Sequence, residues 1–468
     1  MAYPKAMDKS ALSTSVISEL SSIVGSENIL TSTEDRICYA YDGQLVECVP
    51  DAVVRPLDAE QISRIMVLAN QERFPVVPRG AGTGLSGGSV ASSGGIVLDL
   101  TRMNKIIEVD EGNLHMIVEP GVITTAIASK AESMGLLYPP DPGSMSVSTI
   151  GGNVAENAGG LRAGKYGVTR NYLMQIQAVS PTGEAFLSGA RTRKCVAGYD
   201  LVSLMCGSEG TLGVITEISL RLVPMPKYSK AMMATFPDAA SAGQAIANII
   251  AAGLVPSTLE IIDNTTLRVI EDYAHLGLPV EAGALVLVEF DGLVEAVVNE
   301  EAARAINSLT NSGAATVQQA EDAAERDRIW QARRVALAAL SRAKPTSILE
   351  DVTVPLPKLA EMIDRVQKIS ARNSVTIGTF GHAGDGNLHP TILADERDEE
   401  EMKRVEVAVK ELIDDALDLG GTVSGEHGIG FSKAPFLAQE VGEGSMDVMR
   451  KIKRALDPNG ILNPGKFV

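Results

Sequence analysis

Glycine-rich loops dominate residues 78–216 and restrict what this half of the chain can fold into. The chain has 44 glycines in 468 residues, and their density falls sharply after Gly213. Glycine permits tight turns and close approach of a ligand to the main chain. Strand-like and helix-like segments alternate between the loops, which predicts a mixed fold of helices and sheets. Pro224 and Pro226 stand where the composition changes, so we place a domain boundary at residues 222–230.

The first loop reads PRGAGTGLSGG at residues 78–88, and Gly82, Gly84 and Gly87 match GxGxxG. In a dinucleotide-binding Rossmann fold, a helix follows this motif directly and its N-terminus holds the pyrophosphate. Here only residues 89–95, a poor helix former, separate the loop from the next predicted strand. We therefore reject the Rossmann interpretation. Successive N–H groups in such a loop can still bind an anion, although a plain turn remains the alternative for one loop alone.

Two further segments place small residues where a large rigid ligand could lie against backbone: PPDPGSMSVSTIGGNVAENAGG (residues 139–160) and GSEGTLGVI (residues 207–215). With the first loop, they resemble the FAD-binding domain of the vanillyl-alcohol oxidase/p-cresol methylhydroxylase superfamily. That domain holds extended FAD between two α/β subdomains. The resemblance implies that the first loop embraces the pyrophosphate, the second segment lines the other side, and the third sits toward the adenine.

The residues that this resemblance implies for FAD binding are Pro78, Arg79, Gly80, Ala81, Gly82, Thr83, Gly84, Leu85, Ser86, Pro142, Gly143, Thr149, Gly152, Asn153, Ala158, Gly159, Gly160, Glu209, Gly210, Gly213, Ile215 and Asn463. Some members attach FAD covalently through a histidine in the first loop. This loop has none, and the nearest histidine is His115. We therefore expect non-covalent FAD.

Most of the chain's five histidines lie in two short motifs. The first, GHAGDGNLH at residues 381–389, is flanked by extended segments. Its Asp385-Gly386 pair predicts a two-residue type I′ hairpin, in which His382 would face His389 with Cβ atoms about 5 Å apart. Two imidazoles so placed can share one metal ion.

The second motif, SGEHGIG at residues 424–430, supplies Glu426 and His427. Two histidines and one carboxylate leave coordination positions open, as a catalytic divalent site requires. Either motif alone is better explained by a hairpin with satisfied side chains or by a surface histidine than by a metal site. Together they favour a metal site, with His115 and His275 as structural or solvated residues.

The flavin domain combined with GHxGDGNxH and SxEHGxG resembles the FAD-linked D-2-hydroxy acid dehydrogenases over essentially the whole chain. The resemblance implies a divalent metal on His382, His389 and Glu426, usually zinc, with iron or manganese as alternatives. It implies that the metal polarises the substrate hydroxyl, that His427 is the base, and that a hydride passes to flavin N5. It also implies that Arg333 pairs with the substrate carboxylate.

The substrate-binding residues depart from one branch of this group. Without the family, Arg333 is equally well read as a helix-surface residue paired with Glu325 or Asp327. Hydroxyglutarate-type members have a lysine and a threonine beyond this arginine, where the present chain has Leu349 and Leu337. We therefore expect D-lactate or glycolate as substrate, with D-2-hydroxyglutarate as the alternative.

The expected fold is α+β: a two-subdomain FAD-binding domain of the p-cresol methylhydroxylase type over residues 1–225, and a C-terminal α/β substrate (cap) domain over residues 226–468. We expect the tail, residues 430–468, to return to the FAD domain. The formal charge of −18 argues against nucleic acid or an anionic membrane as partner. The N-terminus lacks the pattern of a signal peptide, no apolar run reaches the ~20 residues of a membrane span, and a cytoplasmic location is expected.

The chain has no CxxC pair for an iron–sulfur cluster and no credible NAD site, so its electrons need a separate acceptor. A quinone, a cytochrome, an iron–sulfur subunit or an electron-transfer flavoprotein would serve, and the chain is expected to be a homodimer or a subunit of a complex. One alternative is an electron-transfer subunit of a glycolate oxidase or of an electron-bifurcating lactate dehydrogenase. Another is a metal hydrolase, which the glycine-rich loops disfavour.

Overall fold

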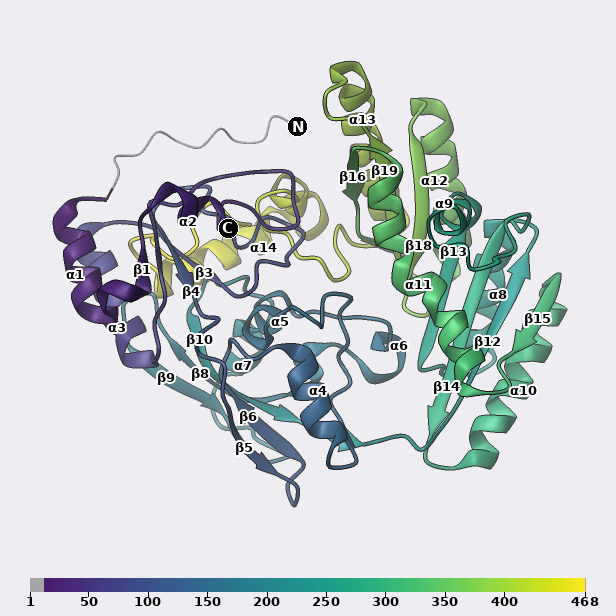
Figure 1. Ribbon diagram of the computed structural model, residues 1–468, viewed down its shortest axis with the longest axis horizontal. Helices are drawn as coiled ribbons and strands as arrows, with labels where there is room; N and C mark the ends of the chain where they lie inside the picture. The colour runs from purple at the N-terminus through teal and green to yellow at the C-terminus, as the bar shows by residue number, and fades with distance from the viewer. Residues whose placement is uncertain (1–11, 468) are drawn as a thin grey trace. The chain divides into compact units, whose positions relative to one another are not determined.

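The computed structural model describes residues 12–467 and divides into two compact units (Figure 1). The first unit runs up to Gly159 and also contains Val168–Pro224 and the chain from Glu426 onward; the second contains Gly160–Gly167 and Met225–Gly425. Residues 1–11, on which the absence of a signal peptide was predicted, lie outside the described part. The sequence did not predict that eight residues after Gly159 group with the second unit. The tail was expected to return to the FAD domain from residue 430, and in the structure the returning segment begins at Glu426.

The first unit contains two larger sheets. In the order β1-β2-β4-β3, strands β2 and β3 run parallel to β4. The second sheet is antiparallel in the order β5-β6-β10-β8-β9, and β7 pairs with β11. The elements are α1 (Thr14–Val24), β1 (Ile29–Leu30), α2 (Thr33–Ile37), β2 (Ala52–Val54), α3 (Ala59–Glu72), β3 (Val76–Arg79), β4 (Ile96–Asp99), β5 (Ile106–Asp110), β6 (His115–Val118), α4 (Thr124–Glu132), β7 (Leu136–Leu137), α5 (Ile150–Glu156), β8 (Leu173–Val179), β9 (Ala185–Gly189), α7 (Leu201–Met205), β10 (Val214–Arg221), β11 (Val223–Pro224) and α14 (Ala434–Leu456).

The C-terminal tail covers the edge of β3 in this unit. Val76 donates its N–H to Ile461 at 2.8 Å, and its carbonyl accepts the Asn463 N–H at 2.8 Å. Pro78 has no N–H to donate, which suits a strand at the edge of a sheet. The tail thus protects an edge that would otherwise expose unpaired backbone groups, and it fixes the strand from which the first glycine-rich loop leaves.

The second unit contains an antiparallel sheet in the order β15-β12-β14-β13-β18-β19-β16, with β17 paired to β19. Buried residues of α8, α10, α12 and α13 form one core with the sheet, whereas residues of α9 and α11 form another with Leu285, Leu287 and Phe380. The elements are α6 (Ala163–Tyr166), β12 (Tyr228–Phe236), α8 (Ala239–Ala251), β13 (Thr258–Asp263), α9 (Asn264–Ala274), β14 (Ala284–Gly292), α10 (Glu295–Asn311), β15 (Thr316–Gln319), α11 (Ala323–Ala343), β16 (Thr346–Leu349), β17 (Val352–Thr353), α12 (Leu359–Asn373), β18 (Thr376–Gly381), β19 (Asn387–Ala394) and α13 (Glu399–Asp418).

Helix α11 illustrates how local sequence sets the frame of the site. Asp322 accepts the Glu325 N–H at 2.9 Å and starts the helix. Arg326, Trp330 and Arg333 follow at spacings of four and three, so they share one face. That face meets the sheet on the side of β13 and β14 that carries acidic residues. No helix within residues 12–467 has the combination of length and apolarity that crossing a membrane requires.

Candidate functional site

The first glycine-rich loop leaves β3 and packs tightly against the second glycine-rich segment. A Cβ on Gly80 would overlap the Thr149 hydroxyl, and one on Gly82, whose φ is +69°, would overlap the Arg79 guanidinium. Arg79 is buried, and its guanidinium lies 5.7 Å from the centre of the Tyr39 ring. The loop therefore needs glycine at both positions, and the Arg79 side chain supports it from within the fold.

The other predicted flavin-binding segments meet this loop inside the first unit. The N–H of Glu209 donates to the Ala155 carbonyl at 2.8 Å, which joins the third segment to the second. Asn463 Nδ2 donates to the carbonyls of Gly88 at 2.9 Å and Glu209 at 2.7 Å. Three segments and the C-terminal tail, far apart in the sequence, thus form one continuous backbone surface.

Buried polar atoms in this surface fit a bound FAD. Ser86 Oγ, Thr149 Oγ1 and Asn463 Oδ1 have no hydrogen-bond partner within the described part of the chain. Buried polar groups are nearly always paired, so a ligand with suitable polar groups would complete these three. The two hydroxyls can donate to phosphate oxygens, and the amide oxygen can accept an N–H.

Several other predicted flavin-binding residues have internal contacts in the fold. Asn153 Nδ2 donates to Thr124 Oγ1 at 2.7 Å, a Cβ on Gly213 would lie 2.9 Å from the Met205 methyl carbon, and Ile215 is buried in β10. Gly160 groups with the second unit. Asn153, Gly213 and Ile215 therefore shape the first unit around the surface just described.

Glu156 was not predicted, although it is one of only two acids in the second segment, the other being Asp141. A Cβ on Gly88 would lie 2.9 Å from its Oε1. Burial, together with the negative charges of Glu209 and Asp42, raises the pKa of Glu156 well above its ordinary value. Glu209 in turn accepts the N–H groups of Ile429 and Gly430 at 2.7 Å each. The residues directly after His427 are therefore anchored within the first unit.

The hairpin in the second unit differs in register from the prediction. Phe380, rather than His382, lies opposite His389, because a turn over residues 383–386 replaces the two-residue type I′ turn. A type I′ turn needs positive φ at both central residues, and among residues 383–386 only Gly386 has it, at +81°. The two imidazoles still meet: the ring centroids of His382 and His389 are 5.1 Å apart, edge to face.

Each imidazole has a buried carboxylate near its Nδ1. Glu260 Oε1 lies 2.7 Å from His382 Nδ1, and Asp351 Oδ1 lies 3.9 Å from His389 Nδ1. Both carboxyl side chains are fully buried. Carboxylates in this position orient histidines that bind metal ions, so the pair of histidines fits a divalent cation.

Arg333 has a different partner from either acid considered for it on the helix surface. Its Nε donates to Glu260 Oε2 at 2.5 Å, and its guanidinium carbon lies 4.6 Å from the centre of the Phe380 ring. Neither Glu260 nor Asp351 was predicted as a functional residue from the sequence. Glu260 had a visible signal, since it is an acid inside the apolar strand TLEIID.

Glu426 and His427 lie where the chain passes from the second unit into the first. Before that passage, Ser424 Oγ donates to Asp351 Oδ2 at 2.7 Å, and a Cβ on Gly425 would overlap the side chains of Asn387 and Thr353. Gly425 is therefore held beside the turn that joins the two histidines. Within the first unit, His427 Nε2 lies 3.7 Å from Glu426 Oε1.

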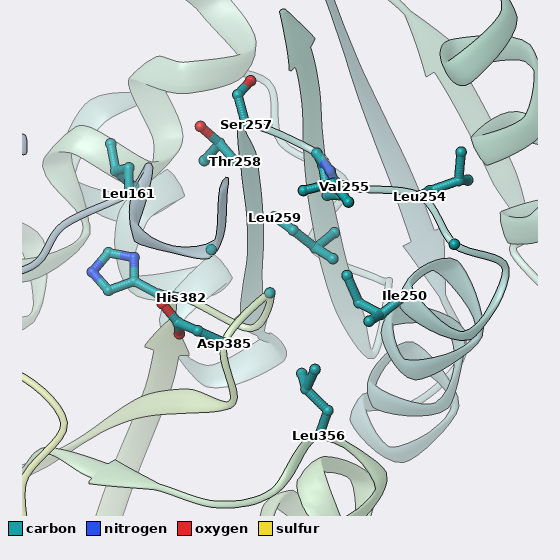
Figure 2. A pocket seen from close by; sticks show the side chains of 14 residues that line it. Leu161, Ile250, Leu254, Val255, Ser257, Thr258, Leu259, Leu356, His382 and Asp385 are labelled. Atoms are coloured by element: carbon teal, nitrogen blue, oxygen red, sulfur yellow. The ribbon is translucent and has the colours of Figure 1, made fainter. Parts of the chain in front are cut away.

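A cavity of about 240 Å³ in the second unit includes His382 in its wall. Its other walls are largely apolar, with Ile250, Leu254 and Leu259 among them. Figure 2 shows the His382 ring on the Leu161 side, pointing away from Ile250 and Leu254. The His382 ring thus forms part of the cavity wall, and it also contacts the His389 ring.

Comparisons with known proteins agree with both halves of this description. Residues 50–187 match the family described as FAD binding domain, and residues 225–467 match FAD linked oxidases, C-terminal domain. The chain is 47% identical over 451 residues to the glycolate oxidase subunit GlcD of Bacillus subtilis (strain 168), covering 96% of each chain. It is 36% identical over 457 residues to a D-lactate dehydrogenase of Anaerostipes hadrus, covering 95% of each.

A solved structure of p-cresol methylhydroxylase with substrate bound has the same fold. Its TM-score is 0.81 at 17% identity, with 97% of this chain and 96% of that chain covered. The fold is therefore the predicted α+β arrangement, a flavin domain of the p-cresol methylhydroxylase type with a C-terminal oxidase domain. By its motifs, its fold and these relatives, the chain belongs to the FAD-linked oxidases, in the group of FAD-dependent D-2-hydroxy acid dehydrogenases.

Proposed function

We propose that the chain oxidises D-lactate or glycolate to the 2-oxo acid with FAD and a divalent cation, zinc before iron or manganese. The observation that carries the proposal is the pair of buried imidazoles, His382 and His389, whose ring centroids are 5.1 Å apart. A carboxylate stands beside each ring, at 2.7 Å and 3.9 Å. The names of the two relatives, a glycolate oxidase subunit and a D-lactate dehydrogenase, support the choice of substrate.

We propose His382, His389 and Glu426 as the cation ligands. Gly425, the residue before Glu426, is packed against Asn387, which lies between the two histidines in sequence. The chain therefore brings the carboxylate-bearing residue out of the second unit from a point beside the imidazoles. A bound cation would lower the pKa of the substrate hydroxyl, and bound FAD would accept the hydride that leaves Cα.

The chain's own residues would bind the acid and take its proton. His427, when neutral, can accept the hydroxyl proton at its ring nitrogen. Arg333 uses Nε for Glu260, so the donors on its two terminal nitrogens form the fork proposed for the substrate carboxylate. Loss of one proton and one hydride converts the hydroxy acid to the 2-oxo acid.

The residues beyond Arg333 support a small monocarboxylic acid. Leu337 lies one helical turn along α11, and Leu349 ends β16. Neither can pair with a second carboxylate as a lysine would. A turnover preference for D-2-hydroxyglutarate over D-lactate and glycolate would contradict this part of the proposal.

Anaerobic bleaching of the flavin tests the proposed reaction. We expect D-lactate or glycolate, but not L-lactate, to abolish the oxidised flavin absorbance of the metal-replete protein. Removal of the cation with a chelator should stop the bleaching, because the hydroxyl then keeps its proton, and added Zn²⁺ should restore it. If no hydroxy acid bleaches the metal-replete protein, the dehydrogenase proposal fails. If bleaching is undiminished after chelation, only the proposed requirement for a cation is rejected.

Acid precipitation tests the mode of flavin attachment. Because the first loop contains no histidine, we expect all the yellow colour to stay in the supernatant when the protein is denatured with acid. Flavin absorbance in the washed pellet would contradict non-covalent binding.

We also propose that the electrons leave through a separate acceptor in a larger assembly. The relative in Bacillus subtilis is named as a subunit of a glycolate oxidase, and the present chain has no CxxC pair for an iron–sulfur cluster. An acceptor protein or a quinone would then reoxidise the flavin after each turnover.

A further inference from the structure

A closed circuit of side chains surrounds the two imidazoles of the second unit. Glu260 contacts both His382 and Arg333, at 2.7 Å and 2.5 Å. The Arg333 guanidinium lies over Phe380 at 4.6 Å, and the Phe380 and His389 rings are 5.4 Å apart. The edge-to-face contact of His389 with His382 closes the circuit. Glu260 is the member that joins a proposed cation ligand to the proposed substrate anchor.

The position of Glu260 in the fold is costly unless the residue is paired. Its side chain is fully buried in β13, a strand whose six residues are all buried. Moving a carboxylate from water into such surroundings costs several kcal/mol, which only close partners offset. Both carboxylate oxygens are used, Oε1 by His382 and Oε2 by Arg333.

We propose that Glu260 is a positioning residue that holds His382 with its Nδ1–H toward the sheet and its Nε2 toward a divalent cation. The inference rests on the proposed function. Arginine offers only donors, so Glu260 Oε2 accepts the Nε–H of Arg333, and Oε1 is the oxygen left to accept from His382 Nδ1 at 2.7 Å. His382 Nδ1 must then carry a proton to donate, which leaves the lone pair of the neutral ring on Nε2.

A second effect follows from the contact with Arg333. Because Nε is bound to Glu260, the plane of the guanidinium is fixed relative to His382. The spacing between the His382 ring, which would hold the cation, and the guanidinium that would bind the substrate carboxylate is therefore set by one side chain. Loss of Glu260 should loosen both ends of the substrate site together.

Glu289 provides a matched control on the neighbouring strand. Thr258 faces Glu289 and Glu260 faces Leu287, so the two acids lie on the same sheet face. Glu289 accepts from Trp330 Nε1 at 2.6 Å and from Arg326 at 2.8 Å and 3.1 Å. Its side chain thus binds the same helix through the same chemistry, but its hydrogen bonds within residues 12–467 go to Arg326 and Trp330 and not to a histidine.

The experiment measures Zn²⁺ affinity of the FAD-loaded full chain by competition with a chelator, for wild type, Glu260→Gln and Glu289→Gln. We expect Glu260→Gln to bind Zn²⁺ 10- to 100-fold more weakly, the usual effect of removing a carboxylate that orients a ligand histidine. The Zn²⁺ affinity of Glu289→Gln should stay within about threefold of that of wild type, although this variant also loses a comparable buried ion pair. We also expect Glu260→Gln, and not Glu289→Gln, to raise the KM for the hydroxy acid.

Each outcome bears on a separate claim. Equal affinity in wild type and Glu260→Gln, or equal losses in both variants, would overturn the positioning role and leave the proposed function standing. A wild-type chain that takes up no Zn²⁺ would overturn the proposed function and this role with it. Should Glu260→Gln fail to fold, ¹⁵N NMR of the metal-free wild type decides: we expect His382 protonated on Nδ1, and protonation on Nε2 alone contradicts the proposal.

Discussion

Replacing His427 with alanine should lower the rate of flavin reduction by D-lactate or glycolate by about 10²- to 10⁴-fold, the range that removal of a general base produces. FAD content and Zn²⁺ content stay at wild-type levels, because the proposed ligands and the flavin-binding loops are untouched. Stopped-flow absorbance under anaerobic conditions measures the rate directly, without the step that passes electrons to an acceptor.

Two additions distinguish a base from a structural residue. Imidazole added to His427→Ala should restore part of the rate in a concentration-dependent way, since a small base can enter the space that the side chain leaves. His275→Asn is the control. His275 is exposed and ends α9 with a φ of +51°, a conformation that asparagine tolerates. The rate of flavin reduction in this variant should therefore equal that of wild type. A His427→Ala rate equal to that of wild type would remove His427 from the proposed chemistry.

Local sequence patterns predicted individual elements well. The acid Asp58 starts α3 by accepting the Gln61 N–H at 2.8 Å, and the apolar residues Ile62, Ile65 and Met66, which have helical spacing, are buried on one face of that helix. The apolar run that begins at Ile96 forms β4, and the charged segment that begins at Glu399 forms α13. These signals depend on neighbours within a few residues, so they can be recognised in the sequence without knowledge of the tertiary structure.

The turn between the two histidines shows where such reasoning stops. Asp385-Gly386 has the composition of a type I′ turn, yet the chain forms a longer turn with only Gly386 at positive φ. A Cβ on Gly386 would overlap the Val354 carbonyl, and the Gly384 N–H donates to the Leu259 carbonyl at 3.0 Å. Contacts with residues outside the hairpin therefore select the turn, and composition alone does not contain them.

The same limit explains the residues that the sequence analysis missed. Glu260 and Arg333 are 73 positions apart, and Asp351 and Ser424 are also 73 apart. Short motifs identify the histidines because these residues lie close together in the sequence. Their carboxylate partners can be recognised only when strands that are distant in the sequence pair. The passage of Gly160–Gly167 into the second unit is likewise fixed through space: Lys165 Nζ and Tyr166 OH bond Asp291 Oδ1 at 2.6 Å and 2.9 Å.

A buried ion pair ties the end of the chain to the flavin-binding unit. Lys453 Nζ donates to Asp457 Oδ2 at 2.6 Å and to the carbonyls of Thr211 and Leu462 at 2.7 Å each. Asp457 also accepts the N–H groups of Ile461 and Leu462. Burial lowers the pKa of Lys453, and the hydrogen bond and charge of Asp457 act in the opposite direction. One side chain thus links α14, the third glycine-rich segment and the tail that covers β3.

Lys453→Met should destabilise the first unit by about 3–5 kcal/mol, because the methionine leaves a buried carboxylate without its cation. The double variant Lys453→Met with Asp457→Asn should recover part of this, since it removes the unpaired buried charge. The recovery is incomplete because the single oxygen of the amide replaces only one of the two carboxylate oxygens that accept the N–H groups of Ile461 and Leu462. Urea unfolding followed by flavin fluorescence reports on this unit, because released FAD becomes fluorescent. Lys451→Met is the control on the same helix: its pair with Asp447, also four residues apart at 2.6 Å, is exposed and should contribute ~0–1 kcal/mol. Equal destabilisation by Lys453→Met and Lys451→Met would mean that burial does not make the Lys453 pair essential to the flavin-binding unit.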